Sequence, residues 1–120
     1  MPAIATMRTV VLDCPDPRAL ARFYAELLGW QVVIDEDDWV SIKGDGDARL
    51  SFQLAPDHQP PRWPDPDHPQ QFHLDLSVDD IDEAEPRTLA LGATRMDHQP
   101  GTDFRVYADP AGHPFCLCWD

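Results

Sequence analysis

The chain has 120 residues, 42% hydrophobic and 26% charged, which is the size and composition of one soluble globular domain. Its formal charge of −13 argues against a nucleic-acid or anionic-lipid partner, because such partners need clustered Lys and Arg. No apolar run approaches the roughly 18 residues of a membrane span. Residues 1–13 lack the features of a secretory signal, so we expect a cytoplasmic protein.

The first elements are predicted to be a buried strand and a one-sided helix. The segment RTVVLDC, residues 8–14, is apolar and β-branched, as buried strands are. The following helix has Asp16 as its N-cap, Pro17 at its first position and Gly29 just past its end. Its apolar residues recur with helical spacing along one side, at Leu20, Phe23, Tyr24, Leu27 and Leu28.

The rest of the chain predicts two copies of one βαβββ module. Strands are expected at residues 30–35, 39–44 and 49–55, and after a proline-rich interval the order strand, helix and three strands returns. These later elements are expected at residues 72–80, 81–92, 93–98, 103–109 and 114–119. Pro86 is expected to kink the second helix or to delay its start.

The fold class predicted from this pattern is α+β, with two βαβββ modules that form a curved mixed sheet around a cavity. Residues 1–120 then make one domain, with modules at about 7–54 and 72–120. The interval 55–71 contains six prolines and is expected to be an extended connector. A second interpretation of this interval is that Arg62 and Trp63 fold over a ligand pocket as a lid, and the two interpretations are compatible.

Period-two alternation divides each strand into two faces. His73, Asp75 and Ser77 lie opposite the apolar residues of their strand, and Cys116 and Cys118 lie opposite Phe115, Leu117 and Trp119. Thr9 and Asp13 share a side of the first strand, Gln53 lies on the polar side of the fourth, and Arg105 and Tyr107 share a side of the seventh. Such polar faces are typical either of a sheet that encloses a small-molecule cavity or of one with a solvated face.

His73 is open to three interpretations: a residue that contacts a ligand, a structural histidine, or a metal ligand. Three cysteines, with two of them two positions apart, favour reduced thiols over a disulfide. Cys116, Cys118 and His73 suit zinc if they face one cavity, and are otherwise two small apolar thiols and an imidazole.

The chain resembles the vicinal oxygen chelate superfamily, which includes glyoxalase I, bleomycin-resistance proteins and extradiol dioxygenases. The resemblance is carried by DPRALARFYAELLGW, HLDLSVDDID, LGAT and DPAGHPFCLCW, which are spread over nearly the whole chain. It implies the glyoxalase/bleomycin-resistance/dihydroxybiphenyl dioxygenase fold, with paired modules around the site and often a homodimer.

Catalytic members of the superfamily usually hold a divalent metal with one residue on each of four strands. By resemblance these positions fall on Thr9, Gln53, His73 and Cys116, and only His73 keeps the usual ligand type. A lone imidazole does not hold a catalytic metal, so we expect no cofactor and no metal of the usual kind.

The sequence therefore predicts a protein that binds a small cationic or aromatic molecule in its cavity, as a homodimer. The expected ligand-binding residues are Thr9, Asp13, Gln53, Trp63, His73, Arg105 and Cys116. One alternative is a lyase or isomerase of glyoxalase type, either zinc-dependent or metal-free with His73, Asp75 and Tyr107 as catalytic acid–base groups. Another alternative is a protein-interaction module whose sheet face is covered by a partner.

Overall fold

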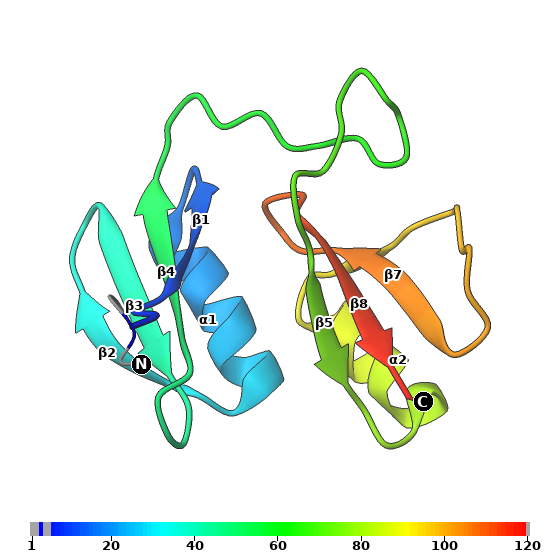
Figure 1. Cartoon of the computed structure of the whole chain (residues 1–120), viewed down its shortest axis with the longest axis horizontal. Coiled ribbons are helices and arrows are strands. Elements are labelled where there is room, and N and C mark those ends of the chain that lie inside the picture. Colours follow the sequence, from blue (N-terminus) through cyan, green and yellow to red (C-terminus); the bar gives the residue numbers. More distant parts are fainter. Residues whose placement is uncertain (1–2, 4–5, 120) are drawn as a thin grey trace. The chain divides into compact units, whose positions relative to one another are not determined.

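The computed structural model describes residues 3 and 6–119, which divide into two compact units between His58 and Gln59. The first residues of the segment used to predict the cellular location, and the last residue of the second module, lie outside this part of the chain. Figure 1 labels most of the helices and strands of both units. Neither helix of the described residues has the length and apolar character needed to cross a membrane.

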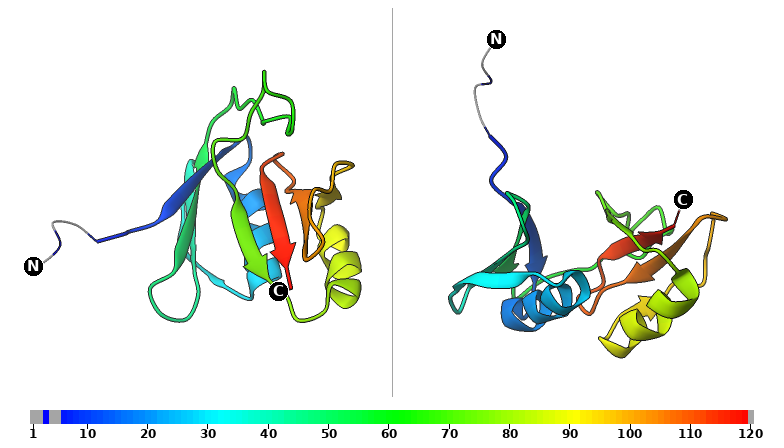
Figure 2. Two further views of the ribbon diagram at one scale, coloured as in Figure 1. Left: turned by 45° about the vertical axis from the view of Figure 1, so that its right-hand side comes forward. Right: turned by 90° about the horizontal axis from the view of Figure 1, so that it is seen from below.

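The first unit is a βαβββ module with a four-stranded mixed sheet. The strand order is β1-β4-β3-β2, in which β1 pairs with β4 in parallel and the other neighbours are antiparallel. Helix α1 packs on one face of this sheet (Figure 2). The elements are β1 (Val10–Cys14), α1 (Pro17–Leu28), β2 (Gln31–Asp35), β3 (Trp39–Lys43) and β4 (Arg49–Leu54).

Helix α1 begins and ends where the sequence predicts. The Asp16 side chain accepts a hydrogen bond from the Ala19 N–H at 3.2 Å, and Pro17 occupies the first turn. Gly29 has φ = 70°, a left-handed conformation that glycine adopts without steric cost, and it ends the helix. The buried side of α1 includes Tyr24, whose ring stacks on Phe52 of β4 at 5.7 Å.

The second unit repeats the same topology, which confirms the predicted duplication. Its strand order is β5-β8-β7-β6, with β5 and β8 parallel and the other neighbours antiparallel. The module therefore matches the first strand for strand. The elements are β5 (Leu74–Ser77), α2 (Ile81–Ala90), β6 (Thr94–Arg95), β7 (Phe104–Ala108) and β8 (Pro114–Cys118).

Helix α2 differs from the expectation that Pro86 delays its start. The helix begins at Ile81 because the Asp80 side chain accepts from the Asp82 N–H at 3.0 Å. Pro86 lies inside the helix, and the Thr88 hydroxyl two positions later donates to the Ala84 carbonyl at 2.9 Å. Leu91 caps the C-terminus, so the helix ends earlier than predicted.

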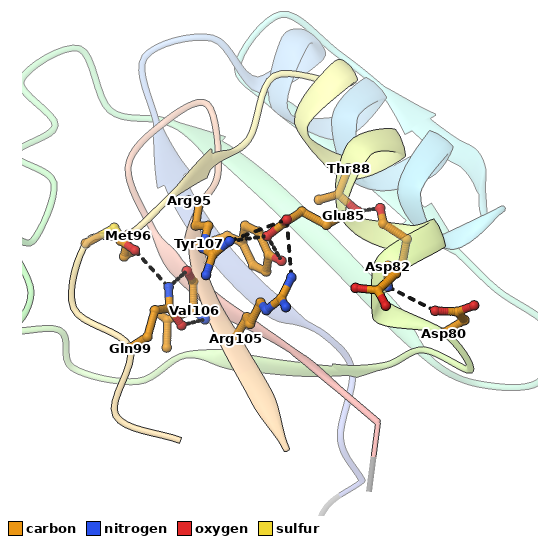
Figure 3. Close-up of polar contacts among 11 residues, drawn as sticks. Asp80, Asp82, Glu85, Thr88, Arg95, Met96, Gln99, Arg105, Val106 and Tyr107 are labelled. Carbon is orange, nitrogen blue, oxygen red and sulfur yellow. Dashed lines mark hydrogen bonds and ion pairs between the residues drawn. The ribbon is translucent and has the colours of Figure 1, made fainter. Parts of the chain in front are cut away.

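Strand β6 is much shorter than the predicted strand over residues 93–98. The Gln99 side chain takes the place of further strand pairing: its amide donates to the Val106 carbonyl at 2.9 Å and accepts from the Val106 N–H at 2.9 Å (Figure 3). The same amide donates to the Met96 carbonyl at 2.8 Å. A side chain that satisfies the backbone of β7 leaves no need for a longer partner strand.

The proline-rich interval 55–71 is not a simple extended connector, because part of it forms a hydrogen-bonded turn. Residues 62–68 form a local turn in which the Arg62 N–H donates to the His68 carbonyl at 2.7 Å. The Asp67 backbone N–H and then His68 lower the pKa of the Asp65 carboxyl, which accepts hydrogen bonds from both. Residues from Gln59 onward belong to the second unit, so most of the interval is part of that module.

Candidate functional site

The strand register decides which residues of the second module share a face. Residues that pair directly across neighbouring strands point to the same side of a sheet. Cys116 of β8 lies opposite Asp75 of β5 and Val106 of β7, so these three residues share one face. Tyr107 lies opposite Phe115, and their rings stack at 5.6 Å on the other face.

This register corrects the prediction that Arg105 and Tyr107 share a site with His73. Tyr107 is fully buried, and its hydroxyl donates to Glu85 Oε1 of α2 at 2.8 Å (Figure 3). Arg105 Nη1 lies 3.2 Å from the other oxygen of Glu85, and Arg95 Nη1 lies 3.3 Å from Oε1. Burial, and then the neighbouring Glu85 carboxylate, raise the pKa of Tyr107 to about 12. Arg105 and Tyr107 therefore link the sheet to α2 through Glu85.

The opposite face of the second module carries two adjoining pockets. The first, of about 190 Å³, has a mainly apolar wall, and the second, of about 300 Å³, has carboxylates and thiols in its wall. They share His73, Phe104 and Cys116. The first is also lined by Trp63, Gln70, Pro100, Val106 and Pro114, and the second by Asp75, Asp103 and Cys118.

Three predicted residues meet where the pockets join. Nε2 of His73, which lies just before β5, is 3.2 Å from Asp75 Oδ1. One donor atom each from His73, Asp75 and Cys116 lies within 4.8 Å of the other two. Burial, and then the Asp75 carboxylate, raise the pKa of the Cys116 thiol to about 12, so the thiol is protonated at neutral pH. The cluster joins one imidazole, one carboxylate and one neutral thiol.

Trp63 lies where the lid hypothesis needs it, in the wall of the apolar pocket. Its ring packs against the His98 ring, with the centroids 5.1 Å apart. In the segment before it, Pro60 lies close against Gly112, where an added Cβ would be only 2.5 Å from the Pro60 Cβ. Gly112 has φ = 94° in the β7–β8 turn. A side chain at this position is disfavoured both by the positive φ and by the close approach of Pro60.

The predicted site residues of the first module lie on the face of its sheet away from α1. Asp13 pairs with Gln53 across β1 and β4, and both side chains are exposed. The Thr9 hydroxyl is engaged with the Ser51 hydroxyl at 2.9 Å, and Ser51 is bonded to Ser41 at 2.7 Å. Thr9 is thus one member of a hydrogen-bonded chain of hydroxyls.

The four positions that the resemblance assigns to metal ligands do not fit the superfamily's divalent metal. Thr9 offers a hydroxyl that is already hydrogen-bonded, Gln53 a neutral amide, and Cys116 a protonated thiol. Only His73 offers a ligand of the usual kind, and hard octahedral metals prefer carboxylate and imidazole donors. The smaller group of His73, Asp75 and Cys116 instead has the mixed donors that zinc accepts.

Several pocket residues escaped the sequence analysis. The site residues predicted in this strand were Arg105 and Tyr107, not the alternate residues Phe104 and Val106, and the β7–β8 register is the signal that places Val106 beside Cys116. Gln70 lies in a segment outside the strands, where alternation says nothing about direction. Asp103 was predicted to lie inside the strand 103–109, but β7 begins at Phe104, so its side chain does not follow the alternation of that strand.

A family model described as a glyoxalase-like domain matches residues 9–118, which is almost the whole chain. The chain belongs to the glyoxalase-like domain family. The predicted membership of the vicinal oxygen chelate superfamily is thereby confirmed. Among curated proteins, no significant match to this glyoxalase-like chain was found.

Solved structures show the same fold at low sequence identity. A glyoxalase/bleomycin resistance/dioxygenase family enzyme from Burkholderia phytofirmans is 20% identical, with 94% of this chain and 97% of that chain covered and a TM-score of 0.74. An antibiotic binding protein from Streptomyces is 21% identical, with 98% of each chain covered and a TM-score of 0.62. A lactoylglutathione lyase from Agrobacterium tumefaciens is 23% identical, with 98% and 95% covered and a TM-score of 0.63.

Proposed function

We propose that this glyoxalase-like protein binds a small organic cation with an aromatic or apolar body, without the metal that catalytic members of the superfamily use. One observation carries the proposal: an apolar pocket and an acidic pocket adjoin on one face of the second module and share His73, Phe104 and Cys116. A ligand that spans them meets apolar surface at one end and carboxylates at the other.

The charges around the two pockets favour a cation. Asp75 and Asp103 line the second pocket, and neither pocket is lined by Lys or Arg in the described part of the chain. Arg105, the nearest candidate in sequence, is paired with Glu85 on the other face. The net charge of −13 adds a favourable long-range field for a positively charged molecule.

The structural relatives support a binding function without fixing it. The Streptomyces protein is named as an antibiotic binding protein, and the Agrobacterium protein as a lyase, so one fold serves both classes. Binding is the better supported function here, because the metal-ligand positions of this chain offer a hydroxyl, an amide and a thiol in place of three usual ligands.

Three indole derivatives that differ in charge test the proposal: tryptamine as the cation, tryptophol as the neutral form and indole-3-propionate as the anion. We expect amide NMR titrations to show that tryptamine binds most tightly of the three. We also expect mass spectrometry to show that tryptamine is chemically unchanged after incubation with the protein. Asp75→Asn is expected to weaken tryptamine binding about three- to tenfold, whereas Asp79→Asn, which changes an exposed carboxylate outside both pockets, is not. Equal affinity for all three molecules, or none, would overturn the proposal.

Trp63→Ala tests the lid. The tryptophan is partly exposed and packs mainly on His98, so its removal is expected to weaken tryptamine binding at least fivefold with little change in the unfolding midpoint. The opposite pattern, in which stability falls and binding is unchanged, would give Trp63 a purely structural role.

A second candidate function, zinc binding, is favoured by the cluster of His73, Asp75 and Cys116. Zinc bound by these groups would displace the proton of the Cys116 thiol, whose pKa is about 12 in the metal-free protein. Zinc affinity would therefore rise about tenfold for each pH unit between pH 6 and about pH 8, as one proton is released per ion.

The zinc candidate is tested by elemental analysis of protein purified without chelator, and by thermal shifts on adding Zn²⁺. Near-stoichiometric zinc that is lost in both His73→Ala and Cys116→Ser supports it. Cys118→Ser is the matched control, since Cys118 lines the same pocket but is outside the three-residue cluster. Metal-free protein with no thermal shift would leave the small-molecule proposal alone.

We also propose that the protein is a cytoplasmic homodimer. Val32 and Val33 support self-association: they are 50% and 48% exposed on β2, one of the two edge strands of the first sheet. Light scattering at several concentrations gives the mass in solution. A monomer at all concentrations, or a Val32→Lys variant that dimerises unchanged, would argue against this surface.

A further inference from the structure

Gln70 carries a polar atom that the fold does not satisfy. Its side-chain carbonyl oxygen, Oε1, is buried and has no hydrogen-bond partner, the only such side-chain atom among the described residues that are not exposed. Most buried polar groups are paired, and each exception calls for an explanation.

Other buried polar side chains of the described chain show the usual behaviour. Ser41 and Ser51 bond to each other, and Thr88 donates to a helix carbonyl. The Asp109 carboxylate accepts from the backbone N–H groups of Ala111 and His113. The lone exception therefore does not reflect generally loose packing of polar groups.

The unsatisfied oxygen belongs to a residue that lines the apolar pocket. Gln70 shares that pocket with Trp63, Phe104 and Val106, which offer it ring and methyl surface. An ordered water needs two to four polar partners, and this wall offers few of them. The oxygen has less than 1 Å² of accessible surface, so a donor on a ligand reaches it only when the terminal amide of Gln70 turns toward the pocket, a rotation about a soft torsion.

The backbone around Gln70 holds the residue beside the pocket. The turn of residues 62–68 is closed by its own hydrogen bonds, and Pro69 follows with a restricted φ. Three residues after Gln70 stands His73, which lines both pockets. The backbone before Gln70 is therefore held in place, and the side-chain torsions remain free to turn the amide toward the pocket.

We propose that Gln70 is a specificity residue, whose carbonyl oxygen accepts a hydrogen bond from an N–H or O–H group on the apolar body of the ligand. The inference rests on the proposed function and narrows it. The ligand class becomes a cation whose ring system carries its own hydrogen-bond donor, in addition to the charged end that meets the carboxylates of the second pocket. Sites built to accept a donor reject analogues that lack it.

A pair of matched probes tests this assignment. Tryptamine has a ring N–H, and its benzothiophene analogue, 2-(1-benzothiophen-3-yl)ethylamine, has a sulfur atom there with nearly the same shape and the same amine. We expect the wild-type protein to bind tryptamine about tenfold more tightly, which is the usual worth of one hydrogen bond to a buried acceptor.

Gln70→Met removes the acceptor and keeps the length of the side chain. In this variant the preference for tryptamine is expected to vanish, and the unfolding midpoint is expected to be unchanged or higher, because an unsatisfied buried acceptor has been removed. Gln70→Glu keeps an acceptor and is expected to keep the preference. Gln71→Met, at an exposed neighbouring position, is the matched control and should behave as wild type.

The outcomes separate the two proposals. If neither amine binds the wild-type protein, the proposed function fails. If both bind equally to wild type and to Gln70→Met, the function stands and the role of Gln70 is refuted. A loss of stability in Gln70→Met, with the tenfold preference intact, would make Gln70 a structural residue and would also refute it.

Discussion

The two modules have the same topology, but the sheet faces that no helix of their own module covers differ in their side chains. In the first, the central pair of residues on that face is Ser41 and Ser51, and in the second the corresponding pair is Val106 and Cys116. The hydroxyls of the first face are bonded to one another, whereas the second face borders two pockets and the unsatisfied oxygen of Gln70. A duplicated fold can thus carry its site on one copy, because function depends on a few side chains of one face.

The helix-side cores offer the harshest test of the likeness between the modules. Phe52 and Phe115 each stack on a buried tyrosine, at 5.7 and 5.6 Å. Phe52→Ala and Phe115→Ala are each expected to cost about 3–5 kcal/mol of unfolding free energy, measured in urea. Leu89→Ala, at a position 38% exposed, should cost much less. A cost near zero for either phenylalanine would show that its module does not depend on this core.

On the helix side of the second module, Glu85 of α2 forms a polar cluster with residues of the sheet. It accepts from Tyr107 and pairs with Arg95 and Arg105, so Glu85→Ala removes the partner of a fully buried hydroxyl and of two partly exposed guanidinium groups. We expect a loss of about 2–3 kcal/mol in urea unfolding. Glu83→Ala, on the exposed side of α2 and 4.0 Å from Arg87, is expected to change stability by less than about 0.5 kcal/mol. Similar costs for both variants would contradict the role assigned to Glu85.

Alkaline pH should destabilise the second module through Tyr107, the hydrogen-bond partner of Glu85, and through Cys116. The folded-state pKa of Tyr107, about 12, lies above its unfolded value near 10, so the native state holds more protons between these values. The contribution of Tyr107 to the free energy of unfolding is therefore fully present below about pH 10 and is lost as the pH rises toward about 12. Cys116, with a pKa of about 12 against a reference of 9.0, acts in the same direction from about pH 9.

Urea unfolding at a series of alkaline pH values measures this loss. Tyr107→Phe removes one of the two contributions, so the stability of this variant should fall less steeply above about pH 10 than that of the wild type. Equal slopes in the two proteins would show that the tyrosine is not protected from ionisation in the folded state.

Sequence periodicity predicted the two modules well because it reports burial on one side of each element. The ends of α1 followed from local chemistry at Asp16, Pro17 and Gly29, and the repeated βαβββ order of elements followed from the recurring pattern. The face of β7 did not follow, since alternation alone gives two sets of residues and no choice between them. Only the pairing of Val106 with Cys116 makes that choice, and pairing is a property of two strands.

The candidate site divides in the same way. His73, Asp75 and Cys116 were predicted from strands that alternate clearly, and they cluster in the structure. Gln70 comes from a segment without periodicity, and Asp103 falls just before the observed start of β7, so in both cases only the packed backbone determines the direction of the side chain.

The smallest expected effects test whether the first face is closed as firmly as its hydrogen bonds indicate. The Trp39 indole N–H donates to Ser41 at 3.0 Å, Ser41 bonds Ser51, Ser51 bonds Thr9, and Thr9 donates to the Val10 carbonyl at 3.2 Å. Each hydroxyl in such a chain can donate and accept, so all of them are satisfied together.

Ser51→Ala removes the middle of this chain and two hydrogen bonds, whereas Thr9→Val removes its end with almost no change of shape. We expect losses of about 1–2 and about 0.5–1 kcal/mol in urea unfolding, with tryptamine affinity unchanged in both variants. If Thr9→Val instead left stability intact and weakened tryptamine binding, Thr9 would be a ligand-binding residue, as the sequence alone suggested. The contrast between a closed first face and an open second one would then fail, because the first face would bind ligand too.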